Sequence, residues 1–119
     1  PSPVILGRML GEYEDGVGGK WKDPDYMKFF DDGQVNYPYV SHGMWYLTQL
    51  RRWGLLKQDI DYAACAAAVN QVGVYGEVAS ALGVAVPKDP MRSETLFDGT
   101  VWDPAKPAEY VAGFKIRAT

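Results

Sequence analysis

Hydrophobic and polar positions recur at helical spacing most clearly between residues 41 and 53. The apolar positions that carry this pattern are Tyr46, Leu47, Leu50 and Trp53. They fall on one face of a helix, because residues three or four apart lie above one another on its surface. Ser41 is a suitable N-cap and Gly54 a suitable stop, so the pattern predicts a helix over residues 41–53.

Weaker helical patterns lie on both sides of this segment. Apolar residues between 4 and 10 predict a short first helix, which the turn-forming run 11–19 would end. Asp23-Pro24 resembles a helix start, with a second helix running to Gly33. Alanines after Asp61 predict another helix, and residues 77–82 predict one that Gly83 ends.

The pattern loosens after Pro87. The string TLFDGTVW at residues 95–102 predicts a small hairpin about Asp98-Gly99, with an extended loop as the alternative. Residues 107–111 can form a last helical turn before the tail. We therefore expect about four to six helices and a short hairpin or extended segment near 95–103.

Composition narrows the class of protein. The chain has 119 residues, of which 47% are hydrophobic and 23% charged, as expected for one globular domain. The net charge of −3 is spread along the sequence without a basic stripe, which argues against nucleic acid as a partner. Since no window approaches the roughly 18 apolar residues of a membrane span, we expect none here. Position 1 is not Met, and we expect the chain to start inside a longer protein.

Catalytic constellations are not evident. His42 is the sole histidine and Cys65 the sole cysteine, so no disulfide can form within the chain. A Cys65–His42 dyad would need an activated thiolate, yet the neighbours of Cys65 are alanines, and we expect a buried, inert side chain. We predict no catalytic residue and no enzymatic activity.

Metal and phosphate motifs are also weak. One histidine and one cysteine cannot supply a zinc site, and the acidic residues around the glycine-rich run do not follow the calcium-hand pattern. No metal or cofactor is predicted. The run 16–20 lacks the Ser or Thr of a phosphate loop, although Lys20 and Trp21 could contact an anion. An exposed turn is the alternative interpretation of the same residues.

Several strings, in order along the chain, resemble the carboxy-terminal region of periplasmic nitrate-binding proteins and their bicarbonate-binding relatives. They are GRMLGEY (7–13), WKDPDYMKFF (21–30), DGQVNYP (32–38), SHGMWYLTQ (41–49), RWG (52–54), MRSETLFDG (91–99) and WDP (102–104). The resemblance covers nearly the whole chain. It implies that residues 1–119 are the carboxy-terminal segment of a solute-binding domain whose amino-terminal part is missing.

The fold implied by this resemblance is a two-lobed α/β periplasmic-binding-protein fold of type II, to which this chain would contribute a helix-rich fragment. The implied function is capture of a small oxyanion for an ABC importer, nitrate or nitrite first and bicarbonate next, and delivery to the permease. Such a protein is periplasmic and meets the membrane only through the transporter or an upstream lipid anchor.

The resemblance places the main ligand side chains upstream of the matched region, so no binding residue is carried over. Candidates within the chain are Lys20, Trp21, Ser41 and His42, because oxyanion pockets combine helix-start N–H groups with a cation or hydroxyl. For Ser41, helix capping is the simpler interpretation.

Other roles stay open at this point. Related binding domains occur as cytoplasmic nitrate-sensing regulators and fused to transporter ATPase subunits. An enzyme resembling those of thiamine-pyrimidine synthesis shares the two-lobed architecture, and an independent helical interaction module is a further alternative.

Overall fold

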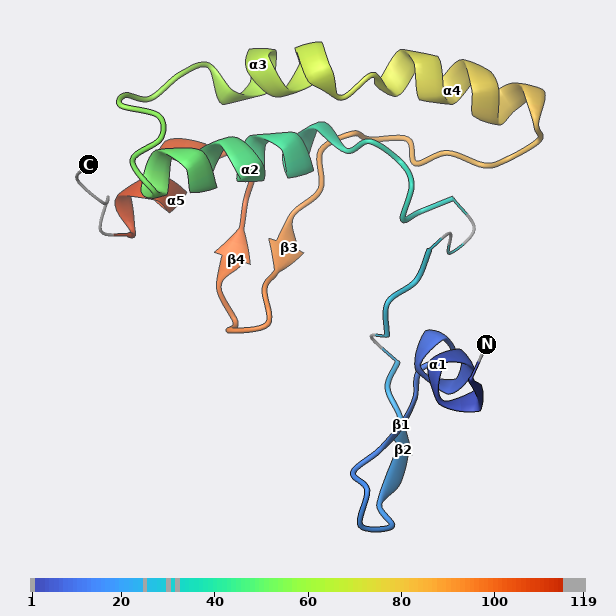
Figure 1. Cartoon of the computed structure of the whole chain (residues 1–119). Coiled ribbons are helices and arrows are strands. Elements are labelled where there is room, and N and C mark those ends of the chain that lie inside the picture. Colours follow the sequence, from blue (N-terminus) through green and yellow to red (C-terminus); the bar gives the residue numbers. More distant parts are fainter. Residues whose placement is uncertain (1, 25, 30, 32, 115–119) are drawn as a thin grey trace. The chain divides into compact units, whose positions relative to one another are not determined.

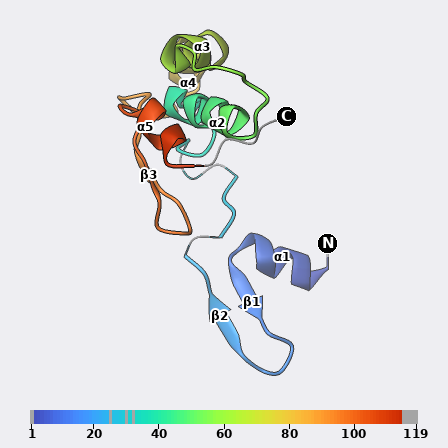
Figure 2. The same cartoon turned by 90° about the vertical axis from the view of Figure 1, so that its left-hand side faces the viewer.

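A computed structural model describes residues 2–24, 26–29, 31 and 33–114. The chain divides into two compact units, Pro1–Asn36 and Tyr37–Thr119, which we call unit 1 and unit 2. Figure 1 shows the elements in chain order, and Figure 2 shows them from the side. Each unit is treated by itself below.

Unit 1 consists of a short helix followed by a hairpin. The helix α1 spans Pro3–Met9, and the antiparallel strands β1 and β2 span Glu12–Glu14 and Lys20–Lys22. Gly11 has φ of 78°, a left-handed conformation suited to glycine, and it ends the helix as the sequence predicted. The hairpin was not predicted, because three residues per strand are too few to reveal an alternating pattern.

The predicted helix from Asp23 to Gly33 is wrong for the residues that the structure describes there; positions 25, 30 and 32 lie outside them. The backbone N–H of Asp23 donates to the carbonyl of Gly11 at 2.9 Å, next to the hairpin, instead of opening a helix. Asp31 and Gly33 have positive φ values of 47° and 85°. Met27 and Phe29 are largely exposed, so a helix here would lack the packed face that stabilises most helices.

Unit 2 is built on the helix α2, Val40–Arg52, which packs against α3, Tyr62–Val69, and α5, Pro107–Ala112. The helix α4, Val72–Ala81, continues from α3, and the strands β3, Glu94–Thr95, and β4, Val101–Trp102, form the second hairpin (Figures 1 and 2). The described residues thus contain five helices and two small hairpins. They are helix-rich, as expected.

The core of unit 2 draws on elements far apart in the sequence. Its buried members are Val40, Met44, Tyr62, Ala66, Trp102 and Val111. Trp102 is only 1% exposed, so β4 anchors the hairpin to the helices. The face of α2 that carries Val40 and Met44 is thereby covered, and this packing stabilises the helix. The apolar face predicted from the sequence is not the buried one, because Tyr46 and Trp53 are 65% and 52% exposed.

Most local predictions in unit 2 are confirmed. Gly54, with φ of 78°, ends α2 in a Schellman motif: its N–H donates to Arg51 O at 3.1 Å, and the N–H of Leu55 donates to Leu50 O at 2.9 Å. The hairpin about Asp98-Gly99 and the last helical turn are present. Gly83 ends α4, although that helix starts at Val72, earlier than predicted.

Two predictions in unit 2 are wrong. Ser41 does not cap α2, because the helix begins at Val40 and its N-cap is Tyr39, which makes no side-chain cap bond. Cys65 is exposed instead of buried. Its neighbour Ala66 faces the core, and successive residues point about 100° apart around a helix, so Cys65 turns away from that face.

Candidate functional site

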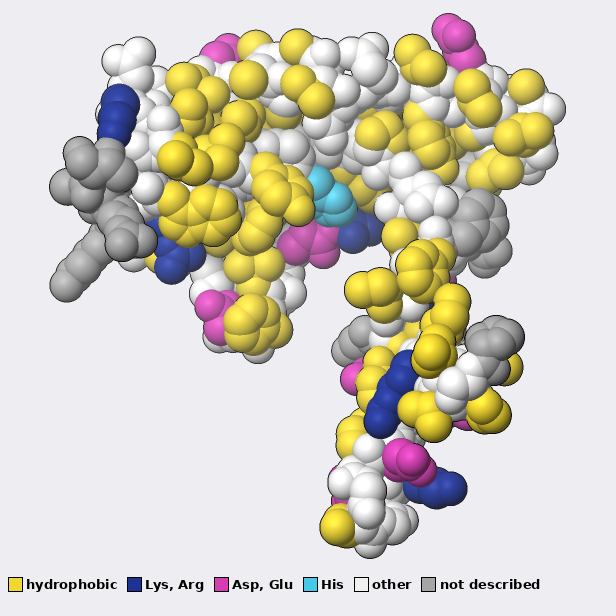
Figure 3. Space-filling model, viewed as in Figure 1, with side chains coloured by type: hydrophobic (Ala, Val, Ile, Leu, Met, Phe, Trp, Pro, Cys, Tyr) yellow, Lys and Arg dark blue, Asp and Glu magenta, His cyan; other side chains and the backbone are white. Residues whose placement is uncertain are grey.

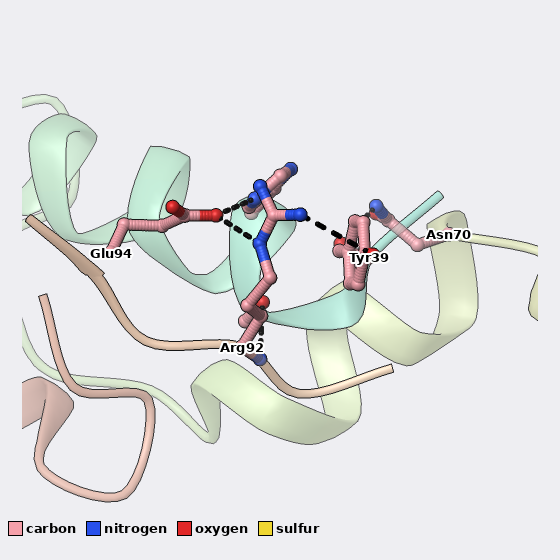
Figure 4. A network of polar contacts seen from close by, with 6 residues as sticks. Tyr39, Asn70, Arg92 and Glu94 are labelled. Atoms are coloured by element: carbon pink, nitrogen blue, oxygen red, sulfur yellow. Dashed lines mark hydrogen bonds and ion pairs between the residues drawn. The ribbon is translucent and has the colours of Figure 1, made fainter. Parts of the chain in front are cut away.

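A polar cluster joins the start of α2 to the segment that enters β3. We call Tyr39, Ser41, His42, Asn70, Arg92 and Glu94 the polar cluster, and Figure 4 shows its contacts. Two of the predicted site residues, Ser41 and His42, belong to it. It holds together three parts of unit 2 that are distant in sequence.

Glu94 is the acceptor at the centre of this cluster. Its Oε1 accepts a hydrogen bond from Nε2 of His42 at 3.0 Å and another from Nε of Arg92. Burial by itself would raise the pKa of Glu94, but the hydrogen bonds from His42 and Arg92, together with the positive charge of Arg92, lower it below its ordinary value. The carboxylate is therefore held ionised.

Arg92 reaches the start of α2 through both its side chain and its backbone. Its guanidinium lies 4.5 Å from the ring centre of Tyr39, and its backbone N–H donates to Ser41 Oγ at 3.1 Å. The N–H of Ser41 in turn donates to Pro90 O at 3.3 Å. Tertiary contacts thus occupy the Ser41 side chain, which lies inside α2 and not at its N-cap.

A close approach of α2 and α3 completes this arrangement. Asn70, the C-cap of α3, donates from Nδ2 to the carbonyl of Tyr39 at 2.9 Å. A Cβ added to Gly43 would come within 2.6 Å of Asn70 Oδ1 and 3.0 Å of Ala66 Cβ. Only glycine lets the helices approach this far without displacement.

The polar groups of this cluster have hydrogen-bond or ion-pair partners within it. Arg92 faces the Glu94 carboxylate, and Ser41, 0% exposed, accepts from a backbone N–H. His42 pairs with Glu94, which does not create the nucleophile–base pair that covalent catalysis requires. The arrangement is suited to fixing the ends of α2 and β3 in place.

The other two predicted site residues, Lys20 and Trp21, line an open hollow in unit 1 between α1 and the β1–β2 hairpin. The hollow encloses about 510 Å³, and its charged lining consists of Arg8, Lys20 and Lys22 against Glu12 and Glu14. Trp21 stacks on Tyr13 with ring centres 5.9 Å apart. The three cations outnumber the two carboxylates, so the hollow is compatible with a weakly held anion.

Two cations of this hollow, Lys20 and Arg8, have local partners. Nζ of Lys20 lies 3.9 Å from Oε2 of Glu14 and is largely exposed, so their attraction is screened by water. The guanidinium of Arg8 lies 4.8 Å from the ring centre of Tyr13 and donates to the carbonyl of Glu14 at 3.3 Å. Lys20 is the more exposed of these two charges.

Sequence reasoning missed Tyr39, Asn70, Arg92 and Glu94. The strings around 41–49 and 91–99 both carried the resemblance, but nothing in them indicated that they meet. Among the described residues, no group of three or more His, Cys, Asp or Glu side chains could hold a metal ion. In the same residues, no helix has both the length and the apolar character to cross a membrane.

Comparison with known proteins gives a consistent group of relatives, although no model of a known protein family matches the chain. The nitrate/nitrite binding protein NrtA of Nostoc sp. is 38% identical over 118 residues, which is 95% of this chain. The bicarbonate-binding protein CmpA of Synechococcus elongatus is 33% identical over 98% of the chain. The nitrate import ATP-binding protein NrtC of Synechococcus elongatus is 32% identical over 94%.

The match covers only part of each relative. The chain spans 27% of the length of the Nostoc protein, 29% of the bicarbonate-binding protein and 17% of the ATP-binding protein. Identity above 30% along almost every residue of this chain shows common descent for that stretch. Over nearly its whole length, the chain is therefore a homologue of a segment of nitrate/nitrite-binding and bicarbonate-binding proteins.

Proposed function

We propose that this chain is the carboxy-terminal segment of the solute-binding component of an ABC importer. The protein captures a small oxyanion, with nitrate or nitrite first and bicarbonate next, and delivers it to the permease without breaking or forming covalent bonds. The observation that carries this proposal is the 38% identity with the nitrate/nitrite binding protein over 95% of the chain. The two-lobed type II fold belongs to the same proposal.

The geometry supports a mainly structural role for this segment in that function. The polar cluster of unit 2 satisfies its own charges, and Ser41 is completely buried, so His42 is the better placed of the two to meet a ligand. In unit 1, Lys20 and Trp21 combine an exposed ammonium group with an aromatic wall. We therefore keep Lys20, Trp21 and His42 ahead of Ser41 as candidates for anion contact.

A periplasmic location follows from the proposed role, because a solute-binding component presents its ligand to the outer side of the permease. Contact with the membrane is then indirect, through the transporter or through an anchor upstream of this segment. A signal sequence or lipid-attachment cysteine in the upstream part of the protein would support export.

A binding domain attached to the transporter ATPase is the second candidate, and the 32% identity with an ATP-binding protein is the observation behind it. A nucleotide-binding domain in the same polypeptide would establish this arrangement. The comparisons do not favour a cytoplasmic sensor or an enzyme of thiamine-pyrimidine synthesis.

The test is thermal unfolding of the full-length protein that carries this chain, in the presence of nitrate, nitrite, bicarbonate or sulfate. A ligand that binds only the folded state stabilises it by about 2.7 kcal/mol at one hundred times its dissociation constant. Nitrate or nitrite should raise the melting temperature most. The proposal fails if none of the four anions shifts the melt at millimolar concentration.

Alanine variants of the candidate residues sharpen this test. If Lys20 contacts the anion, Lys20→Ala should weaken binding by about tenfold, the loss of roughly one charge-assisted hydrogen bond. Lys88→Ala removes the same charge from an exposed position in unit 2 and serves as the matched control. Unchanged affinity in Lys20→Ala and His42→Ala would remove these two residues from the candidates for anion contact.

A further inference from the structure

Two Asp-Gly peptides among the described residues lie in turns of closely matched geometry. Asp15-Gly16 follows β1, and Asp98-Gly99 lies between β3 and β4. All four residues are exposed, and the two glycines have φ values of 79° and 82°. Figures 1 and 3 show both turns at the free ends of their hairpins. A third pair, Asp32-Gly33, includes a residue outside the described ones.

In each turn the aspartate side chain folds over the peptide that follows it. Oδ1 of Asp15 accepts from the backbone N–H of Val17 at 2.9 Å, and Oδ1 of Asp98 accepts from that of Thr100 at 2.9 Å. Such a bond to the second residue along the chain brings the carboxyl carbon near the nitrogen of the glycine in between. Gly19 donates a further bond to Oδ1 of Asp15. Both turns therefore bring the same two atoms together, Cγ of the aspartate and N of the glycine.

The hydrogen bonding of the glycine nitrogen differs between the two turns. The N–H of Gly99 donates to the carbonyl of Leu96 at 2.8 Å. The N–H of Gly16 has no hydrogen-bond partner in the part of the chain that the structure describes. A bonded N–H exchanges its proton only after the bond opens, whereas an exposed and unbonded one is accessible to water at all times. The nitrogen of Gly16 is thus the more readily deprotonated.

The anchoring of the two hairpins differs in the same direction. Trp102, which pairs with Glu94 across the second hairpin, is 1% exposed and fixes β4 on the core of unit 2. Among the described residues of unit 1 only Gly11 and Gly33 are buried, so the β1–β2 hairpin has no comparable anchor. Because local opening costs less where few side chains are buried, the first turn rearranges more easily.

We propose that Asp15 is a site of spontaneous isoaspartate formation and that the turn at Asp98 resists the same reaction. The nitrogen of Gly16 attacks Cγ of the protonated Asp15 carboxyl group. A C–N bond forms, the carboxyl hydroxyl leaves with the amide proton as water, and a cyclic succinimide results. Water then opens the ring at either carbonyl and gives back aspartate or leaves isoaspartate. Since water is the only other reactant, the inference goes beyond the oxyanion function and does not depend on it.

The product changes the hairpin beside the hollow of unit 1. Isoaspartate carries the main chain through the former side chain, which adds a backbone carbon to the turn. The bond from the N–H of Asp15 to the carbonyl of Gly19, 3.1 Å long, closes this turn and cannot keep its geometry. Lys20 follows directly, so the modification alters the start of β2 and with it the lining of the hollow.

The test measures isoaspartate at both positions in the full-length protein, incubated without added anion at mildly alkaline pH. Peptide mapping with electron-transfer fragmentation distinguishes isoaspartate from aspartate at each position. Isoaspartate should accumulate at Asp15 at least about threefold faster than at Asp98, a factor that corresponds to one ordinary hydrogen bond. Equal rates, or a faster reaction at Asp98, overturn the proposal.

The same incubation in guanidinium chloride separates the effect of structure from that of sequence. Both turns are unfolded there, so the two rates should converge. A ratio that persists in the unfolded chain would show that neighbouring residue types set the rates, and it overturns the proposal.

A matched pair of variants provides an independent readout. Glutamate closes the corresponding larger ring much more slowly, so Asp15→Glu should lower the total isoaspartate of the folded protein more than Asp98→Glu does. Equal decreases overturn the proposal. Neither measurement uses an anion: if no anion shifts the melt while Asp15 is modified as expected, the oxyanion function fails and this site stands.

Discussion

Units 1 and 2 are both rich in apolar residues, yet among the residues that the structure describes only those of unit 2 enclose a core. In unit 2, side chains from α2, α3, β4 and α5 meet around Met44 and Trp102. In unit 1, the helix meets its hairpin through Gly7 and Arg8, and the apolar residues of α1 stay exposed. The difference shows that stability depends on which side chains distant elements bring together, more than on how many are apolar.

The largest expected effect comes from removing the centre of the unit 2 core. Trp102→Ala should destabilise unit 2 by about 3–5 kcal/mol, because it removes a fully buried aromatic side chain and leaves a cavity. Urea unfolding followed by circular dichroism measures this change. Phe97→Ala, at a fully exposed position of the same hairpin, should stay within about 0.5 kcal/mol of the unmodified protein. Similar losses in both variants would contradict the core described for unit 2.

Two glycines test the close approach of helices in unit 2. Gly43→Ala should cost about 1–3 kcal/mol, because its methyl group would collide with Asn70 and Ala66. Gly76→Ala in α4 meets nothing within 4 Å and should stabilise by about 0.5–1 kcal/mol through helix propensity. Chemical unfolding of both variants gives the comparison, and stabilisation by Gly43→Ala would contradict the packing described for α2 and α3.

The polar cluster should produce a pH-dependent contribution. Glu94→Gln is expected to destabilise unit 2 by about 1 kcal/mol at neutral pH, since it weakens the bonds with His42 and Arg92. Because the folded-state pKa of Glu94 is lowered, its contribution is complete above the ordinary glutamate pKa of about 4.3 and is lost as the pH falls through the folded-state value. Unfolding at neutral and acidic pH should show the two proteins converging in acid.

The smallest expected effect is local to unit 1. Oδ1 of Asp15 accepts from the backbone N–H groups of Val17 and Gly19 at 2.9 Å, and these bonds lower its pKa. Asp15→Ala should speed hydrogen exchange at those two amides while the unfolding midpoint of unit 2 stays unchanged. Asp15→Asn retains an acceptor and serves as the control. A shift of the unit 2 midpoint would show that the units do not unfold independently.

Local signals were sufficient to predict much of the fold. Gly54, Gly83 and Asp98-Gly99 each mark an element end or turn through nearby backbone geometry, and the structure confirms all three. The predicted helix after Asp23 failed because a local start signal does not provide a partner surface. The two strands of unit 1 were too short to show a period.

The contacts of the polar cluster could not be predicted from local patterns in the sequence. His42 and Glu94 are 52 residues apart. Ser41 is a suitable residue type for a helix cap, but its hydroxyl accepts a hydrogen bond from the backbone N–H of Arg92 instead. The residue types in the sequence therefore pointed to Ser41 and His42, two members of the cluster, but not to their partners. The oxyanion came from resemblance, since nothing in the charge pattern selects nitrate over another anion.

The exposed side chain of Cys65 is a natural site for chemical labelling of this chain. It is the only cysteine in the sequence, and it lies on α3 one position before the core residue Ala66. Within this segment, a thiol-reactive fluorophore would therefore attach at a single known position. Its emission would report, in real time, whether α3 stays packed on α2 when the protein binds an anion or a transporter.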